Sequence, residues 1–159
     1  MKNFAKTISE IEKYARKGKT EKVKNVLKWY KDPHIKSSEK NKIVYQVFVK
    51  EFLPLNIALT VINPGNINGE YFMTKGHIHK SLKEEFYVLL GGKGILFLQK
   101  GNKVKTIHLK KGELVLIEKS YAHRLINTGD KKLEVLTVYH EGSKPSYNFK
   151  FKKRFFKKK

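Results

Sequence analysis

The feature that most constrains the fold is a series of short β-rich runs between residues 43 and 142. The runs are KIVYQVFVKEF, LNIALTVI, EEFYVLL, GILFLQK, KVKTIHL, ELVLIE, HRLIN and KLEVLTVYH. Between them stand clusters such as NPGNING, GGKG and NTGDKK, whose glycine, asparagine and aspartate residues favour tight turns. Short strands at even spacing, without helices between them, indicate an all-β fold, either an antiparallel sandwich or a small barrel.

The residues before this stretch predict helix instead. Thr7 and Glu10 have the spacing of a capping box, in which two side chains bond the backbone at the start of a helix. A second helical pattern of apolar residues starts at Val23 and would end at the KDP of residues 31–33. We therefore expect an N-terminal helical extension over residues 1–42 that packs on the β-domain.

The last part of the chain, residues 143–159, ends in a tail that is both basic and aromatic. Of its last eleven residues, seven are lysine or arginine and four are phenylalanine. Basic side chains with interleaved aromatic rings suit nucleic acid or an anionic membrane surface. An exposed terminus without a partner is the alternative that we prefer, and the tail does not exclude nucleic acid.

The charge of the chain favours small anionic partners over nucleic acid. The 159 residues carry a net charge of +21, from 32 lysines and 3 arginines against 14 acidic residues. Proteins that read nucleic acid favour arginine, because its guanidinium forms paired hydrogen bonds with phosphate and guanine. A lysine-rich surface would still attract anionic small molecules over a long range.

Composition also limits the compartment and the chemistry. The chain has no cysteine, so any metal site must use histidine and carboxylate. No apolar run approaches the roughly 18 residues of a membrane span. The first residues lack the apolar segment of a secretion signal. We expect a cytoplasmic protein without a membrane span.

A candidate metal site stands out within the β-rich region. Side chains two residues apart share one face of a strand, so His77 and His79 point the same way. Glu85 opens the next β-rich run, and His123 lies in a later one. Three imidazoles and one carboxylate suit a divalent first-row metal, with two octahedral positions left for water or substrate oxygens.

Two spaced motifs carry a resemblance to a known family. His77, His79, Glu85 and Gly92 match the first cupin motif, and the stretch from Gly112 to Asn127 resembles the second. INPGNINGEYFMTKGHIHK, EEFYVLLGGKGILFLQ and YAHRLINTGDKKLEVLTVY together resemble the cupin-type phosphoglucose isomerases of archaea and some bacteria. The resemblance implies a cupin β-barrel, or jelly roll (double-stranded β-helix), over residues 43–142. It also implies a metal-dependent enzyme that interconverts glucose 6-phosphate and fructose 6-phosphate, and a homodimer.

The resemblance also implies roles for individual residues. One divalent metal, with Fe²⁺ the first choice and Mn²⁺, Ni²⁺, Zn²⁺ or Co²⁺ as alternatives, would be held by His77, His79, Glu85 and His123. The phosphate of the phosphosugar would be bound by Tyr45, Thr60, Thr74, Lys75, Gly76 and Tyr87. Catalytic roles would fall to Glu85, Tyr139 and Tyr147.

One geometric consequence concerns Thr74 and His77, which have opposite parity on a regular strand. For both side chains to face one pocket, the backbone must bulge between them. Gly76 suits such a bulge, because glycine accepts the backbone angles that a bulge needs. We therefore predict a β-bulge at this glycine.

The chain departs from the family after its last long strand. The family continues Tyr-Pro-x-x-x-Gly-His-x-Tyr, whereas this chain reads YHEGSKPSY, with Pro145 in the position of the histidine. His140 lies five positions earlier and is a possible substitute. A cupin that binds a metal or a sugar phosphate without turnover, and an isomerase of another phosphosugar, are therefore the alternatives.

Overall fold

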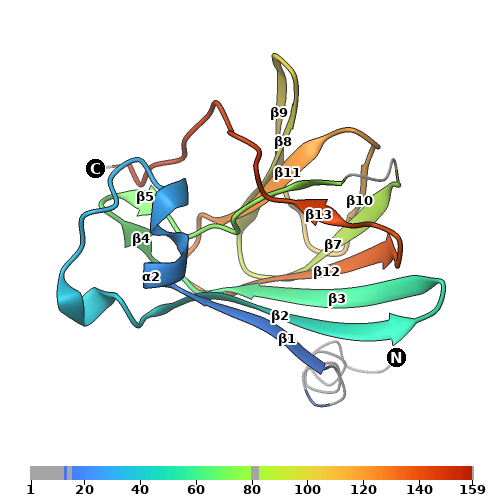
Figure 1. The fold of residues 1–159 in the computed structure, drawn as a ribbon, viewed down its shortest axis with the longest axis horizontal. Coiled ribbons are helices and arrows are strands. Elements are labelled where there is room, and N and C mark those ends of the chain that lie inside the picture. Colours follow the sequence, from blue (N-terminus) through green and yellow to red (C-terminus); the bar gives the residue numbers. More distant parts are fainter. Residues whose placement is uncertain (1–12, 14–15, 80–82, 159) are drawn as a thin grey trace.

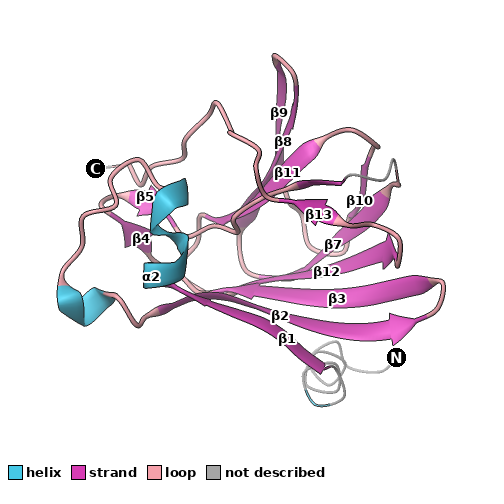
Figure 2. Ribbon diagram, viewed as in Figure 1, coloured by secondary structure: helices cyan, strands magenta, loops and turns pink. Residues whose placement is uncertain are grey.

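The computed structural model describes residues 13, 16–79 and 83–158, and β-strands dominate it (Figure 1, Figure 2). The strands are β1 (Arg16–Lys22), β2 (Ile43–Phe52), β3 (Leu55–Ile62), β4 (Asn66–Ile67), β5 (Glu70–Tyr71), β6 (Ile78–His79), β7 (Glu85–Gly91), β8 (Gly94–Lys100), β9 (Lys103–His108), β10 (Leu114–Ile117), β11 (Ala122–Asn127), β12 (Leu133–His140) and β13 (Pro145–Ser146). Over residues 16–79 and 83–158 the helical elements are α2 (Val23–Val26) and two 3₁₀ turns, η1 (Leu27–Trp29) and η2 (Ser37–Glu39).

The longer strands form two antiparallel sheets. The large sheet has the order β1-β2-β3-β12-β7-β10, and the small sheet has the order β11-β8-β9. Figure 1 shows the large sheet across the lower part of the molecule, with β8, β9 and β11 rising above it. Strands far apart in sequence, such as β3 and β12, are direct neighbours. The predicted all-β jelly roll is confirmed, and its one short α-helix, α2, lies near the N-terminus.

The inner face of the large sheet changes from apolar to polar along its strands. At one end Ile62 of β3 opposes Leu133 of β12, and both are fully buried. At the other end Asn56 opposes Tyr139, which in turn opposes Glu85 of β7. Burial of the apolar end drives the sheets together. The polar end leaves room for a site at the mouth of the barrel.

The N-terminal region differs from the predicted helical extension. Residues 16–22 form β1, which pairs antiparallel with β2, and not a helix. Pairing with the free edge of β2 satisfies backbone groups, and this long-range contact overrides the local sequence pattern. The predicted helix after it is a single turn, in which Val23 and Val26 are buried. The capping box predicted at 7–10 lies outside the described residues.

The basic and aromatic tail packs on the barrel. Phe151 is 9 % exposed, and its ring centre lies 4.4 Å from the guanidinium carbon of Arg124 and 5.1 Å from the ring centre of Phe149. Arg154 forms an ion pair with Glu70, with Nη1 3.1 Å from Oε1. Most of these rings therefore pack within the fold and are not available to stack on nucleic-acid bases.

In the described part of the chain, no helical segment has the length and apolar character of a membrane-spanning helix.

Candidate metal and substrate site

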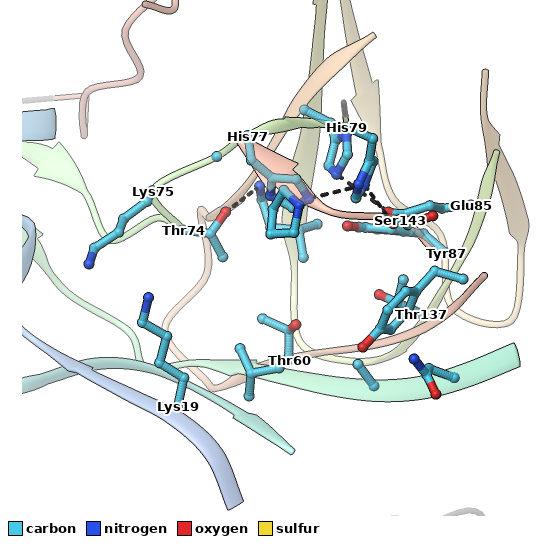
Figure 3. A pocket seen from close by; sticks show the side chains of 18 of the residues that line it. Lys19, Thr60, Thr74, Lys75, His77, His79, Glu85, Tyr87, Thr137 and Ser143 are labelled. Carbon is cyan, nitrogen blue, oxygen red and sulfur yellow. Dashed lines mark hydrogen bonds and ion pairs between the residues drawn. The ribbon is translucent and has the colours of Figure 1, made fainter. Parts of the chain in front are cut away.

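The four predicted metal ligands converge at the polar end of the barrel. Their ligand atoms all lie within 4.8 Å of one another. His79 Nε2 is 2.6 Å from Glu85 Oε1 and 3.1 Å from His77 Nε2. His123 Nε2 is 3.4 Å from Glu85 Oε2. Figure 3 shows His77, His79 and Glu85 directed toward one another.

A bulge in the backbone positions the first two histidines. Isolated bridges join Met73 to Ile126 and His77 to His123. Three residues therefore separate the bridges on one strand and two separate them on the other. Gly76 lies among the three and has a φ of +69°, which favours glycine. The predicted bulge at this glycine is confirmed, and it lets side chains on both sides of the glycine reach one cavity.

The protonation of the cluster fits a bound cation. Burial, and then the neighbouring His123 and His79, hold the pKa of His77 well below its usual range. Burial also lowers the pKa of His123, although the Glu85 charge opposes this shift. His123 Nδ1 lies 3.2 Å from the carbonyl oxygen of Tyr121, so this nitrogen carries the proton. The other ring nitrogen, Nε2, is buried and presents a lone pair to a Glu85 carboxylate oxygen. No described residue donates a hydrogen bond to this nitrogen. A divalent metal would satisfy both acceptors.

Two phenols, the buried Tyr87 and the partly buried Tyr139, stand beside the cluster. Burial, and then the Glu85 charge, raises the pKa of Tyr87 well above its usual value. Burial, and then the Glu85 charge, also raises the pKa of Tyr139. Both phenols therefore keep their protons at neutral pH and are able to donate a hydrogen bond to a ligand.

The opposite side of the cavity is cationic. Glu21 Oε1 lies 2.8 Å from Lys75 Nζ and 2.9 Å from Lys19 Nζ. Burial raises the pKa of this carboxyl, but the two lysines outweigh it and the net pKa falls below 4.5. The trio therefore carries one net positive charge. In Figure 3 the two ammonium groups point toward each other, away from Glu85 and Tyr87.

Neutral donors lie near the two lysines. Thr74 Oγ1 accepts a hydrogen bond from the backbone N–H of Leu125 at 3.1 Å, and its own hydroxyl hydrogen remains to donate. Thr60 and Tyr45 are buried in the same cavity wall. Burial, and then the Glu21 charge, raises the pKa of Tyr45, so this phenol stays protonated. An anion between these groups would meet both positive charge and hydroxyl donors.

Every site residue predicted from the sequence lines one cavity of about 390 Å³. The shared set is Tyr45, Thr60, Thr74, Lys75, Gly76, His77, His79, Glu85, Tyr87, His123, Tyr139 and Tyr147. Polar residues of the wall that the sequence did not indicate are Lys19, Asn56, Thr137, Glu141, Ser143 and Lys144. The first of these comes from β1, the strand that the sequence pattern did not predict.

The segment after β12 closes the cavity without an imidazole. Pro145 opposes His79 in the β13–β6 pair and lines the wall. Tyr147 stands on the same side, with its ring centre 5.7 Å from that of His77. His140 Nδ1 instead accepts a hydrogen bond from the backbone N–H of Gly142 at 2.9 Å. It is not among the described residues that line the cavity.

Comparison with known proteins identifies close relatives. The sequence model of the family "Glucose-6-phosphate isomerase (GPI)" matches residues 35–155. The glucose-6-phosphate isomerase of Thermococcus litoralis is 37 % identical over 125 residues, 75 % of this chain and 66 % of that protein. The Pyrococcus furiosus enzyme of the same name is 35 % identical over 125 residues, with the same coverage of both chains. The chain thus matches slightly less than two thirds of the length of these relatives.

Solved structures agree on the fold. An oxalate decarboxylase from Bacillus subtilis superposes with a TM-score of 0.52 at 18 % identity, over 62 % of this chain and 26 % of that chain. An oxalate oxidase in complex with glycolate gives a TM-score of 0.56 at 14 % identity, over 66 % and 55 % of the two chains. Both neighbours are cupins, so the jelly roll is a cupin barrel. With the family match over residues 35–155, the chain belongs to the cupin-type glucose-6-phosphate isomerase family.

Proposed function

We propose that this chain is a metal-dependent isomerase that interconverts glucose 6-phosphate and fructose 6-phosphate. The observation that carries the proposal is the meeting of all the predicted metal-binding, phosphate-binding and catalytic residues in one cavity. The family membership supports the same reaction. The cationic side of the cavity suits a phosphate dianion, and the histidine cluster suits the sugar carbons that react.

The metal in this proposal is one divalent ion held by His77, His79, Glu85 and His123. Fe²⁺ is the first candidate, and Mn²⁺, Ni²⁺, Zn²⁺ and Co²⁺ also accept this mixed nitrogen and oxygen donor set. When bound, the ion would act as a Lewis acid that polarises the carbonyl of the open-chain sugar. The lone pairs of His123 Nε2 and Glu85 Oε2, which face one another, support this assignment.

Glu85 is the residue that we assign to proton transfer. Moving hydrogen between C1 and C2 through an enediol requires a base near both carbons, and Glu85 is the carboxylate of the cluster. In a hydride-shift route this carboxylate would only hold the metal. Tyr87, Tyr139 and Tyr147 line the same cavity wall as Glu85 and would orient the sugar.

The phosphate end of the substrate would lie between the two lysines and the neutral donors. Lys75 supplies charge, and Thr74 and Thr60 supply hydroxyl groups at the same wall. Gly76 has no side chain, so backbone N–H groups near it can approach a phosphate closely. Tyr45 adds a protonated phenol. Tyr87, on the side of the cavity near the histidine cluster, is the remaining residue of the predicted phosphate-binding set.

We also propose a homodimer in the cytoplasm. The outer face of the large sheet exposes apolar side chains on β7 and β10, which are neighbouring strands. Leu114, Leu116 and Phe86 are 60 %, 43 % and 40 % exposed, and Leu116 opposes Phe86 directly. A second copy of the chain would bury this patch. Phosphosugar metabolism fits a cytoplasmic enzyme without a membrane anchor.

The experiment that tests the proposed function is a coupled assay of a panel of phosphosugars. Fructose 6-phosphate should be converted to glucose 6-phosphate with a higher kcat/KM than mannose 6-phosphate or ribose 5-phosphate. A preference for another member of the panel would make the chain an isomerase of that sugar. Binding of sugar phosphate without turnover of any member would refute the catalytic assignment.

A further inference from the structure

A buried pair of polar atoms at the metal end of the cavity has no assigned role. Asn56 Oδ1 and Ser143 Oγ have no hydrogen-bond partner in the described part of the chain. The two residues are only 9 % and 5 % exposed, and both line the cavity. A polar atom that is buried without a partner is costly for a folded protein, so two such atoms in the wall of one cavity call for a bound partner.

The strand register explains why Asn56 faces the cavity. It opposes Tyr139 across the β3–β12 pair, and Tyr139 opposes Glu85 across the β12–β7 pair. Asn56 lines the cavity in the same row as Tyr139 and the Glu85 carboxylate, and its Oδ1 has no hydrogen-bond partner among the described residues.

Ser143 reaches the same place from the turn that follows β12. Its backbone N–H donates to the carbonyl of His140 at 2.8 Å, and the backbone N–H of Glu141 donates to the carbonyl of Pro54 at 3.0 Å. These bonds hold the turn against the end of β3, next to Asn56. In Figure 3 the Ser143 side chain lies on the Glu85 side of the cavity, away from Lys19.

The two ends of the cavity therefore differ in chemistry. Asn56 and Thr60 lie four residues apart on β3, or about 13 Å along the strand. Positive charge and hydroxyl donors gather at the Thr60 end, and the unpartnered neutral atoms gather at the Asn56 end. This arrangement suits an elongated ligand with a dianion at one terminus and neutral hydroxyl groups at the other.

We infer that Asn56 and Ser143 bind hydroxyl groups of the sugar at the end remote from its phosphate, and so determine which sugar is accepted. The inference rests on the proposed function for its ligand class. A serine hydroxyl both donates and accepts hydrogen bonds, and the unpaired Oδ1 of Asn56 accepts one from a hydroxyl group. The pair therefore recognises the neutral hydroxyl groups of a sugar and not a charged group. The segment that holds Ser143 is also the one where Pro145 replaces the family histidine.

Calorimetric titration of the full-length chain with fructose 6-phosphate and with inorganic phosphate tests the inference. Ser143→Ala should raise the Kd for fructose 6-phosphate about tenfold and change the Kd for inorganic phosphate less than about twofold, because one ligand hydrogen bond is lost at the sugar end only. Its thermal midpoint should equal or exceed that of the wild type, because a buried unpaired hydroxyl is removed. Ser146→Ala, in β13 and outside the cavity wall, is the matched control.

Asn56 needs a second comparison because its neighbour Tyr139 would itself orient the sugar. Asn56→Ala is therefore also measured in the Tyr139→Phe background, where the phenol hydroxyl is already absent. It should weaken fructose 6-phosphate binding further in that background, again with binding of inorganic phosphate unchanged. No further loss of sugar binding in the double variant would contradict the role of Asn56.

The outcomes separate this inference from the proposed function. Unchanged binding of fructose 6-phosphate by Ser143→Ala, or a lowered thermal midpoint, would overturn the inference even in an active isomerase. No binding of fructose 6-phosphate by the wild type would also overturn it. A selective loss of sugar binding in a chain without turnover would leave the inference standing and refute only the isomerase assignment.

Discussion

Glu85 is the single residue on which the site depends most. Its oxygens lie 2.6 Å from His79 Nε2 and 3.4 Å from His123 Nε2, and it lines the same cavity as the buried Tyr87. A neutral amide in its place would lose both the proposed base and a proposed anionic metal ligand. We predict that Glu85→Gln lowers kcat by about 10³-fold or more in the coupled assay and weakens metal binding. The exposed neighbour Glu84 provides the control, and a Glu84→Gln variant should behave like the wild type.

Glu21 links the site to the pH dependence of stability. Because the two lysines hold the pKa of its carboxyl below 4.5 in the folded chain, the unfolded state binds a proton more readily. The stabilisation is thus present above about pH 4.5 and disappears as the pH falls through the lower folded pKa. Glu21→Gln should cost about 2 kcal/mol of unfolding free energy at pH 7 and much less near pH 3. Urea unfolding at the two pH values measures this, and a cost that did not shrink in acid would argue against the ion pairs.

Site residues with distinctive chemistry could be predicted from the sequence, and the others could not. Histidines 77 and 79 stand out because the chain has only six histidines. Lys19 is one of 32 lysines, so no local signal separates it from the surface. Asn56 and Ser143 can be recognised as site residues only in the folded structure, where β3 pairs with β12 and their polar atoms have no hydrogen-bond partner among the described residues. These residues depend on contacts between distant segments, which a single sequence does not reveal.

The same distinction applies to the elements. The β-rich runs from 43 onward match strands because alternate side chains bury one face, as in β10, where Val115 and Ile117 are buried and Leu114 and Leu116 are exposed. The sequence does not predict β1, which contains RKGKTEK and no apolar residue. It forms because the edge of β2 offers backbone partners. The tail was predicted as an exposed terminus, yet Phe149, Phe151 and Phe155 pack on the core of the barrel. Their packing depends on contacts with distant segments, which the local sequence does not reveal.

Packing of the tail leads to a prediction about the loop that carries the proposed ligands His77 and His79. A Cβ atom added to Gly76 would lie 2.5 Å from Phe151 Cε2, so the Phe151 ring packs directly against this loop. Phe151→Ala should cost about 3 kcal/mol of stability and also weaken metal binding, because His77 follows Gly76 directly. Thermal unfolding and metal titration measure the two effects.

Phe156 is the control for that prediction. It is 44 % exposed, so Phe156→Ala should change stability by less than about 0.5 kcal/mol. If Phe151→Ala lowered the stability no more than this variant, the tail would not support the loop.

At the scale of the whole molecule, the outer face of the large sheet leads to a prediction about assembly. A buried lysine in an apolar interface is strongly unfavourable, whereas on a free surface it is harmless. If a second copy covers this face, Leu116→Lys should convert a dimer to a monomer in light scattering while the strand content stays unchanged. A wild type that is already monomeric would rule out the homodimer.

The central claim is that the four ligands hold a metal on which isomerisation depends. The most direct measurement is the fructose 6-phosphate assay on chelator-treated protein, repeated after addition of Fe²⁺, Mn²⁺, Ni²⁺, Zn²⁺ or Co²⁺, with His77→Ala in parallel. We predict no turnover after chelation, recovery with at least one metal, and no recovery in His77→Ala. Full activity after complete removal of metal, or in His77→Ala, would contradict the account.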